Sequence, residues 1–212
     1  MDLAAIRKEY KQKTLLETDV AKDPITQFAT WFAEATNSDI DEVTAMTIAT
    51  CSNAAVPSAR TVLLKGYSEK GFVFYTNYNS QKGIELQENP RASLLFFWPA
   101  LERQIRITGI VQKLAPTESD AYFKSRPIGS QIGAIASPQS HVIANREWLQ
   151  NEVDYLTTSV EENNITRPKN WGGFIVQPVA IEYWQGRPSR LHDRLLYTLQ
   201  PNGEWSIDRL AP

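Results

Sequence analysis

The stretch IEYWQGRPSRLHDR, residues 181–194, joins the pattern of a strand to a concentration of charge. Its first residues predict a strand that ends at Gln185, and a glycine and a proline then break the strand. In an extended segment alternate side chains point the same way, so we expect Arg190, His192 and Arg194 to line one face.

These two arginines flank one of only two histidines in the chain. Two permanent cations would be costly in a sealed core, but they suit a pocket that receives an anionic ligand. Trp184, at the end of the predicted strand, favours such a pocket. A polar strand entry with solvated arginines is the alternative.

The bulk properties limit the classes of protein to which the chain can belong. Its 212 residues are enough for one domain, and a hydrophobic fraction of 42% supports a substantial core. The formal net charge of −2 argues against general nucleic-acid binding. With no signal-peptide pattern and no apolar run of membrane-spanning length, we expect a cytoplasmic protein without a membrane partner.

Outward from the opening stretch, most of the chain shows short runs rich in β-branched and aromatic residues, separated by turn signals. The turns Ser68–Gly71 and Pro201–Gly203 predict hairpins. Many short strands with a few peripheral helices predict a mainly β fold, an antiparallel barrel. The predicted strands are 44–51, 58–66, 71–77, 92–98, 103–114, 171–185, 195–200 and 205–209.

Helices are expected between some of these strands. Asp23 and Pro24 have the pattern of an N-cap and a first-turn proline, and Ser80 is a second cap. Thr117–Asp120 resembles a capping box that opens a helix ending before Pro127. Asn145 caps a longer helix whose apolar stripe predicts core packing: Leu149, Val153, Leu156 and Val160.

Residues 1–20 are polar, and we expect a mobile arm or a short helix there, followed by a single domain over residues 21–212.

Three constellations upstream contain groups that bind anions. In the run 60–65, Arg60 and Lys65 fall on opposite faces of a strand and could hold one anion each. Tyr75 and Thr76, followed by Ser80-Gln81-Lys82 at a helix start, could cradle a phosphate. Solvated strand ends, and a helix cap with a solvated lysine, would explain the same residues.

The third constellation is Tyr122, Arg126 and Ser130, whose spacing of four would align them on a continuous helix, although Pro127 interrupts it. A phenol, a guanidinium and a hydroxyl together would bind a second phosphate. A solvated helix end explains Arg126 equally well. Two histidines and the single Cys51 have no familiar metal-ligand spacing, so no metal is expected.

Taken in order, these motifs resemble the pyridoxamine 5′-phosphate oxidase family. In that family an E-x-W segment, here Glu182 to Trp184, is followed by R-L-H-D-R, here residues 190–194. The upstream pieces and the terminal WSIDRLAP also occur in the family's order, so the resemblance spans nearly the whole chain. It implies an FMN-binding split barrel that works as a homodimer with two flavins at the subunit interface.

The resemblance also implies site residues by position. Arg190 and His192 would be catalytic, with Leu191 beside them at the substrate, and an arm with Arg7, Lys8, Glu9 and Tyr10 would close over it. The substrate phosphate would be held by Lys65, Tyr122, Arg126 and Ser130. FMN would contact Arg60, Thr61, Val62, Leu63, Leu64, Lys65, Tyr75, Thr76, Gln81, Lys82, Gln104, Gln139, Ser140, Trp184 and Arg194.

One position departs from the family pattern. Gln81 stands where an arginine is common, so a permanent cation is missing beside the FMN phosphate. A charged hydrogen bond contributes about 1.5–3 kcal/mol, so FMN could bind up to roughly a hundredfold more weakly.

The reaction implied is oxidation of pyridoxamine or pyridoxine 5′-phosphate to pyridoxal 5′-phosphate, with O2 as acceptor and H2O2 released. The amine substrate would also release ammonia. Such an enzyme would serve vitamin B6 salvage and pyridoxal phosphate biosynthesis. A flavin reductase or a noncatalytic flavin-binding split-barrel protein is the nearest alternative, and a noncatalytic dimeric interaction protein is a more distant one.

Overall fold

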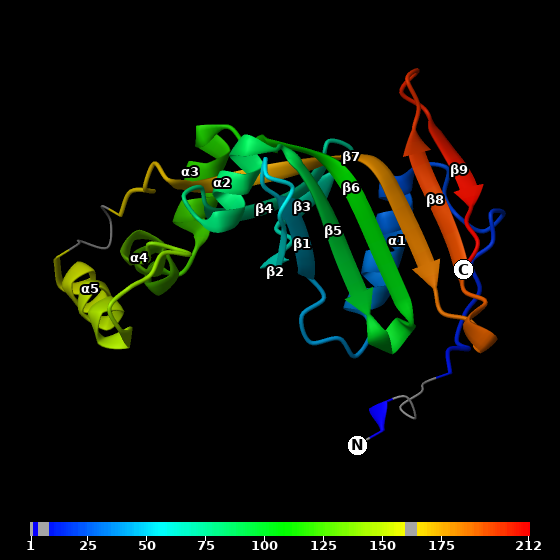
Figure 1. The fold of residues 1–212 in the computed structure, drawn as a ribbon, viewed down its shortest axis with the longest axis horizontal. Coiled ribbons are helices and arrows are strands. Elements are labelled where there is room, and N and C mark those ends of the chain that lie inside the picture. The colour runs from blue at the N-terminus through cyan, green and yellow to red at the C-terminus, as the bar shows by residue number, and fades with distance from the viewer. Residues whose placement is uncertain (1, 4–8, 160–164) are drawn as a thin grey trace.

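One antiparallel sheet organises the computed structural model, which describes residues 2–3, 9–159 and 165–212 (Figure 1). The strands run in the order β2-β1-β5-β6-β7-β4-β3, and β8 and β9 continue the sheet from β7. Their bounds are β1 Ala45–Cys51, β2 Pro57–Leu63, β3 Gly66–Ser68, β4 Gly71–Asn77, β5 Arg91–Trp98, β6 Arg103–Lys113, β7 Trp171–Gln185, β8 Asp193–Leu199 and β9 Trp205–Arg209. The prediction of a mainly β antiparallel fold is confirmed.

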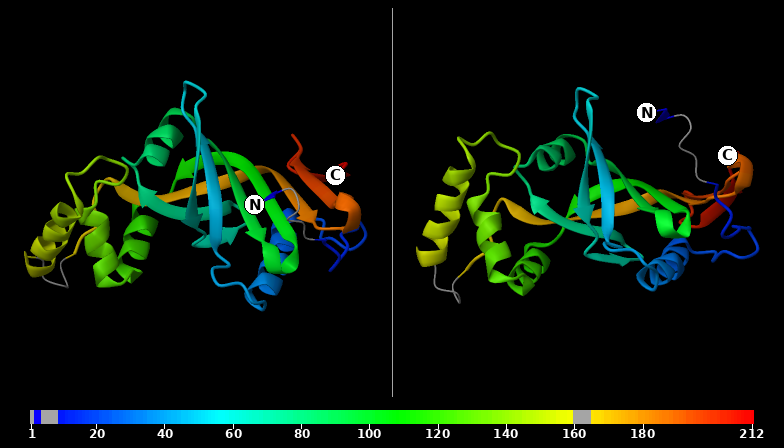
Figure 2. Two further views of the ribbon diagram at one scale, coloured as in Figure 1. Left: turned by 60° about the horizontal axis from the view of Figure 1, so that its bottom comes forward. Right: turned by 90° about the horizontal axis from the view of Figure 1, so that it is seen from below.

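The long strand β7 is the spine of the sheet. Its first part, Trp171–Val176, pairs with β4, and its last part, Ala180–Gln185, pairs with β8. β6 follows its other edge with a register shift at Gly109, where a Cβ would lie 2.3 Å from the carbonyl oxygen of Gln177. Such an irregularity bends a sheet, and this one curls into a half-barrel (Figure 2).

Helix α1, Pro24–Thr36, lies against the curled sheet (Figure 2). The Asp23 carboxylate accepts the backbone N–H of Thr26 at 2.6 Å, as the sequence predicts for an N-cap. Phe28 is fully buried, with its ring 4.9 Å from that of Phe72 and 5.4 Å from that of Phe96. Burial of a side chain of this size contributes about 1.5–3 kcal/mol, so this face anchors the helix.

The other helices gather near the start of β7 (Figure 1). They are α2 Gln81–Glu88, α3 Pro116–Ser125, α4 Ile128–Ala136 and α5 Arg146–Ser159. Phe123, Ile132, Ile165 and Trp171 form a small buried cluster between them. None of the helices in the described part of the chain is both long and apolar enough to cross a membrane.

The α5 stripe is less buried than predicted. Val153 and Leu156 are only partly buried where they pack against that small cluster, and Val160 lies outside the described residues. The cap itself is confirmed, because Asn145 accepts the N–H of Trp148 at 2.8 Å.

Several local predictions are wrong. The capping box is shifted: α3 begins at Pro116, and Glu118 reaches back to the N–H of Ala115 at 3.2 Å. The predicted strand 58–66 is two strands, and α4 was not expected. Residues 188–190 form a 3-10 turn, so Arg190, His192 and Arg194 do not share one extended segment.

The segment from residue 9 to 20 contacts the end of the sheet. Glu102 accepts the N–H groups of Lys11 and Gln12 at 2.8 and 3.1 Å, and Asp193 accepts that of Leu15 at 3.1 Å. The Leu15 side chain is buried. A mobile arm that covers substrate stays a prediction, and Arg7 and Lys8 lie outside the described residues.

Candidate functional site

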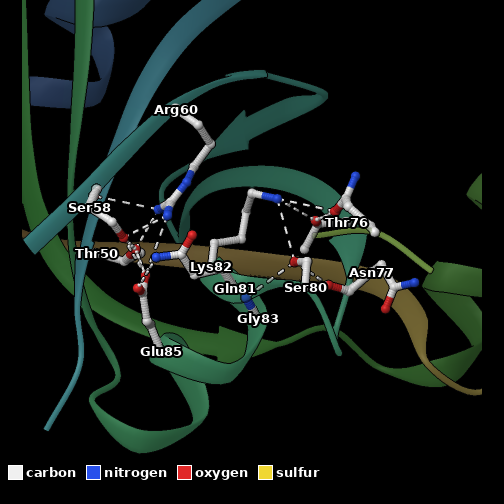
Figure 3. Close-up of polar contacts among 11 residues, drawn as sticks. Thr50, Ser58, Arg60, Thr76, Asn77, Ser80, Gln81, Lys82, Gly83 and Glu85 are labelled. Atoms are coloured by element: carbon white, nitrogen blue, oxygen red, sulfur yellow. Dashed lines mark hydrogen bonds and ion pairs between the residues drawn. The ribbon is translucent and has the colours of Figure 1, made fainter. Parts of the chain in front are cut away.

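The start of α2 holds a buried ammonium group. The Lys82 side chain leaves the first turn of the helix and donates to Thr76 at 3.2 Å, Gln139 at 3.1 Å and Ser80 at 3.4 Å (Figure 3). Lys82 is absent from the ion pairs of the described residues. Burial lowers its pKa to about 8, helped by the charge of Arg60 and opposed by that of Glu85. A buried cation without a counter-ion indicates an anion site.

That ammonium faces a cavity of about 280 Å³ between β2, β4, α2 and α3. Lys65, Lys82 and Arg126 contribute three cations, and the described lining includes no acidic residue. The remaining lining residues are Thr61, Val62, Leu63, Tyr75, Thr76, Tyr122, Gln139 and Trp171. The structure therefore brings together residues from each of the three upstream constellations, although not Arg60, Gln81 or Ser130, and the Leu64 side chain is buried in the core.

Arg126 connects this cavity with a second one of about 320 Å³ that Ser130 lines. Its guanidinium lies 4.7 Å from the ring of Trp171, and its buried Nη1 has no hydrogen-bond partner among the described residues. The continuous helix suggested by the spacing of four does not exist, because α3 ends at Ser125 and Arg126 is extended. Arg126 nevertheless lines one cavity together with Tyr122 and the other together with Ser130.

Arg60 is not among the residues that line this cavity, and its side chain extends toward Glu85 of α2 (Figure 3). Its Nη2 donates to Ser58 at 2.6 Å and to the Glu85 carboxylate at 3.4 Å, and its Nη1 donates to Thr50. The amide of Gln81 donates to the other Glu85 oxygen at 3.0 Å. Burial raises the pKa of Glu85, but the hydrogen bonds that its carboxylate accepts from Ser58, Thr50 and Gln81, together with the charge of Arg60, outweigh burial and keep that pKa below its usual value.

A second group of predicted site residues lies at the other end of β7. The Trp184 ring is 4.6 Å from the ring of His192, and Tyr10 packs edge-on against both. Gly186 permits this approach, since a Cβ there would lie 2.7 Å from the Tyr10 side chain. Gln104 is the cross-strand neighbour of Trp184.

The charged residues of this second group differ in their surroundings. Arg190 is exposed with a φ of +63°, and Leu191 is 68% exposed. Arg194 instead donates to the buried Glu182 at 2.9 Å, and Arg106 pairs with the same carboxylate. The pKa of His192 is lowered by burial and by the charge of Arg190.

The two groups are separated along β7. Tyr75 is paired with Gly173, whereas Gln104 and Arg194 are paired with Trp184, eleven residues further along. At about 3.3 Å per residue this is roughly 35 Å of strand. In one copy of the chain the two groups therefore lie at opposite ends of β7.

Sequence reasoning missed some residues of the site. Trp171 lines both cavities, and its only signal was its place at the start of a strand. Glu85 could have been found from its spacing of four from Gln81 on one helix. Thr50 and Ser58 gave no signal, because only the pairing of β1 with β2 brings them to Glu85. Ser140 and Glu9 are exposed and line neither cavity.

Comparison with known proteins decides the family. A family model described as pyridoxamine 5′-phosphate oxidase matches residues 32–159, and one described as the pyridoxine 5′-phosphate oxidase C-terminal dimerisation region matches residues 171–212. The chain belongs to the pyridoxamine 5′-phosphate oxidase family. It is 52% identical to the pyridoxine/pyridoxamine 5′-phosphate oxidase of Cupriavidus necator over 99% of each chain, and 50% identical to that of Salinibacter ruber over 99% of each. The names of these relatives support the assignment of this chain as an oxidoreductase.

Solved structures support the family's split-barrel fold. PhzG from Burkholderia lata 383, in complex with tetrahydrophenazine-1-carboxylic acid, superposes with a TM-score of 0.87 at 30% identity, over 94% of this chain and 98% of PhzG. A pyridoxamine 5′-phosphate oxidase-related FMN binding protein from Nostoc punctiforme has a TM-score of 0.72 at 18% identity, over 90% and 98%. The fold is an FMN-binding split barrel. The C-terminal part of the chain matches a dimerisation region, and the family and its fold suggest a flavin cofactor.

Proposed function

We propose that the chain is an FMN-dependent oxidase that converts pyridoxamine and pyridoxine 5′-phosphate to pyridoxal 5′-phosphate. Dioxygen is the acceptor, H2O2 is released, and the amine substrate also releases ammonia. The observation that carries the proposal is a cavity with three cations and no described acidic lining residue, in a chain of this family. Two phosphate groups, one on the cofactor and one on the substrate, supply the matching charge.

The residues fit FMN on physical grounds. Lys82 is a buried ammonium without a carboxylate partner at the N-terminus of α2, where the helix dipole also favours an anion. Lys82 and Thr76 would hold the FMN phosphate. Arg126, with its buried unpaired Nη1, would hold the substrate phosphate together with Tyr122, Ser130 and Lys65. Two fixed phosphates orient the reacting atoms and lower the entropic barrier.

The site is completed by a second copy of the chain. The group at the far end of β7 lies roughly 35 Å of strand from the cavity, so it would reach the ligands held by a partner. The match to the dimerisation region supports this arrangement. Each dimer would then contain two equivalent sites.

Arg190 and His192 would face the substrate ring from that partner. Arg190 stays protonated, so its role is to orient the substrate and balance charge. The Nδ1 of His192 accepts the N–H of Arg187 at 3.1 Å, so the neutral ring carries its proton on Nε2 and can donate from there. FMN, when bound, would supply the redox chemistry that couples oxidation of the substrate at C4′ to reduction of O2.

An anaerobic titration tests this function. The purified protein should have an FMN absorption spectrum, and pyridoxamine 5′-phosphate should bleach it without O2. Admission of air should restore the colour and yield H2O2 and pyridoxal 5′-phosphate. A protein with FMN that does not bleach would be a passive flavin binder. Bleaching by NADH alone would indicate a flavin reductase, and bleaching only by a reduced phenazine carboxylate would indicate a reaction of the PhzG kind.

A further inference from the structure

Glu85 is a buried carboxylate beside the proposed cofactor site. It is 6% exposed, and both of its oxygens accept hydrogen bonds. One oxygen accepts from Ser58 at 2.6 Å and also from Thr50, and the same two hydroxyls accept from the Arg60 guanidinium. Arg60 is therefore bound to Glu85 both directly and through two hydroxyl groups (Figure 3).

This network draws a cation away from the cavity. Thr61, Val62 and Leu63 of β2 line the cavity, but the neighbouring Arg60 does not. The Lys82 ammonium points the other way, toward Thr76 (Figure 3). Arg60 and Glu85 are still close enough to act on Lys82, because both charges shift its pKa. The network and the cavity are thus electrostatic neighbours.

The neutral side chain of Gln81 leaves Arg60 as the cation that balances the charge of Glu85. Gln81 lies one turn before Glu85 and is exposed, and it offers only a neutral amide at 3.0 Å. Among the described residues, Glu85 forms an ion pair with Arg60 alone. A buried carboxylate that loses its cation is strongly destabilised, so Glu85 competes for Arg60 with any anion in the cavity.

We propose that Glu85 is a built-in competitor of the cofactor phosphate: it retains the Arg60 guanidinium outside the cavity and so weakens FMN binding by this chain. The inference rests on the proposed function, since it takes FMN as the ligand. It assigns an affinity-setting role to a residue that does not line the cavity. It also gives Gln81 an indirect role, because a cation at position 81 would pair with Glu85 and release Arg60.

The test measures FMN dissociation constants of full-length, flavin-stripped protein by quenching of flavin fluorescence. Glu85→Gln should tighten FMN roughly tenfold, within the range of one charged hydrogen bond. Gln81→Arg should do the same, and the double variant should gain far less than the product of the two. Binding of riboflavin, which lacks the phosphate, should not change in any variant.

Two controls separate release of Arg60 from a general change of charge. Glu88→Gln removes the same charge from an exposed position of the same helix and should leave the FMN dissociation constant unchanged. In an Arg60→Met background, Glu85→Gln should no longer tighten FMN. Thermal unfolding of each variant shows that the fold is retained.

Three outcomes would overturn the inference. Weaker FMN binding by Glu85→Gln would mean that Glu85 positions Arg60 for the phosphate instead. If Glu85→Gln tightened FMN equally with and without Arg60, the effect would be one of net charge. If Glu85→Gln left the FMN dissociation constant unchanged, Glu85 would have no influence on the cofactor site. If the unmodified protein binds neither FMN nor riboflavin, the proposed function fails together with the inference, whereas the first three results leave that function intact.

Discussion

The two ends of β7 differ in how their polar groups are held. At the cavity end, Lys82 is buried and fixed by three oxygen acceptors, and Arg126 is packed against Trp171. At the β8 end, Arg190 is exposed on a 3-10 turn, and Leu191 beside it is 68% exposed. The cavity end keeps its cations within one chain, whereas the β8 end presents Arg190 and Leu191 outward.

The two ends therefore contribute differently to the proposed site. Burial of cations costs desolvation free energy, and a bound phosphate would offset that cost. The cavity end is therefore pre-organised to bind a phosphate. The electrostatic interactions of an exposed group such as Arg190 become strong only when another surface excludes water from that group. We therefore expect the β8 end to become functional against the cavity end of a second copy.

The largest effect expected is rescue of activity in a mixed dimer. Arg126→Ala disables the cavity end and Arg190→Ala disables the β8 end, so each homodimer should lose roughly ten- to a hundredfold in kcat/KM. A heterodimer of the two variants, isolated with two different tags, has one site with both residues intact. By symmetry it should recover about half of the unmodified activity. A heterodimer as inactive as its parents would place the whole site within one chain.

The next effect separates the two anions at the cavity end. Lys82→Met should weaken FMN roughly ten- to a hundredfold, because it removes a charged donor, and should leave riboflavin unaffected. Arg126→Ala should retain the flavin and chiefly raise KM for pyridoxamine 5′-phosphate. Lys124→Met, an exposed residue of α3, is the matched control. Loss of flavin from Arg126→Ala would mean that the two phosphate sites are exchanged.

A smaller effect follows from the pKa of Lys82, which burial lowers to about 8. Below this pH the ammonium is charged and attracts the phosphate, and above it the charged fraction falls. The FMN dissociation constant should therefore be level from about pH 7 to 8 and then rise by at most about tenfold per pH unit. Fluorescence titrations check this, and in Lys82→Met the rise above pH 8 should disappear. An equal rise in that variant would assign the titration to another group.

Much of the cavity end could be predicted from the sequence. Local patterns placed Ser80 as a cap and Tyr75 and Thr76 on a strand, and the structure confirms those elements. The direction in which Arg60 points could not be predicted, because it depends on Thr50 and Ser58 from a paired strand and on Glu85 from a helix. Such a network depends on tertiary packing, which strand periodicity does not describe.

The β8 end shows the limit of strand periodicity more directly. The alternation rule put Arg190, His192 and Arg194 on one face, but a 3-10 turn intervenes and Arg190 adopts a φ of +63°. Arg194 then pairs with Glu182, which lies on the cross-strand neighbour β7. The motif was nevertheless informative, because its order of residues carries the family resemblance without needing the local geometry.

The smallest effect expected concerns this unusual backbone at Arg190. A non-glycine residue in the left-handed region costs about 1–2 kcal/mol, and a glycine avoids that cost while losing about 0.4–1 kcal/mol through the unfolded chain. In urea titrations the free energy of unfolding of Arg190→Gly should therefore be about 0.5–1 kcal/mol higher than that of Arg190→Ala. Both variants should slow single-turnover flavin reduction equally, because both lack the guanidinium. If alanine were the more stable substitution, the turn would not be held in its left-handed form in solution, and flavin reduction at the unmodified rate would remove Arg190 from the site.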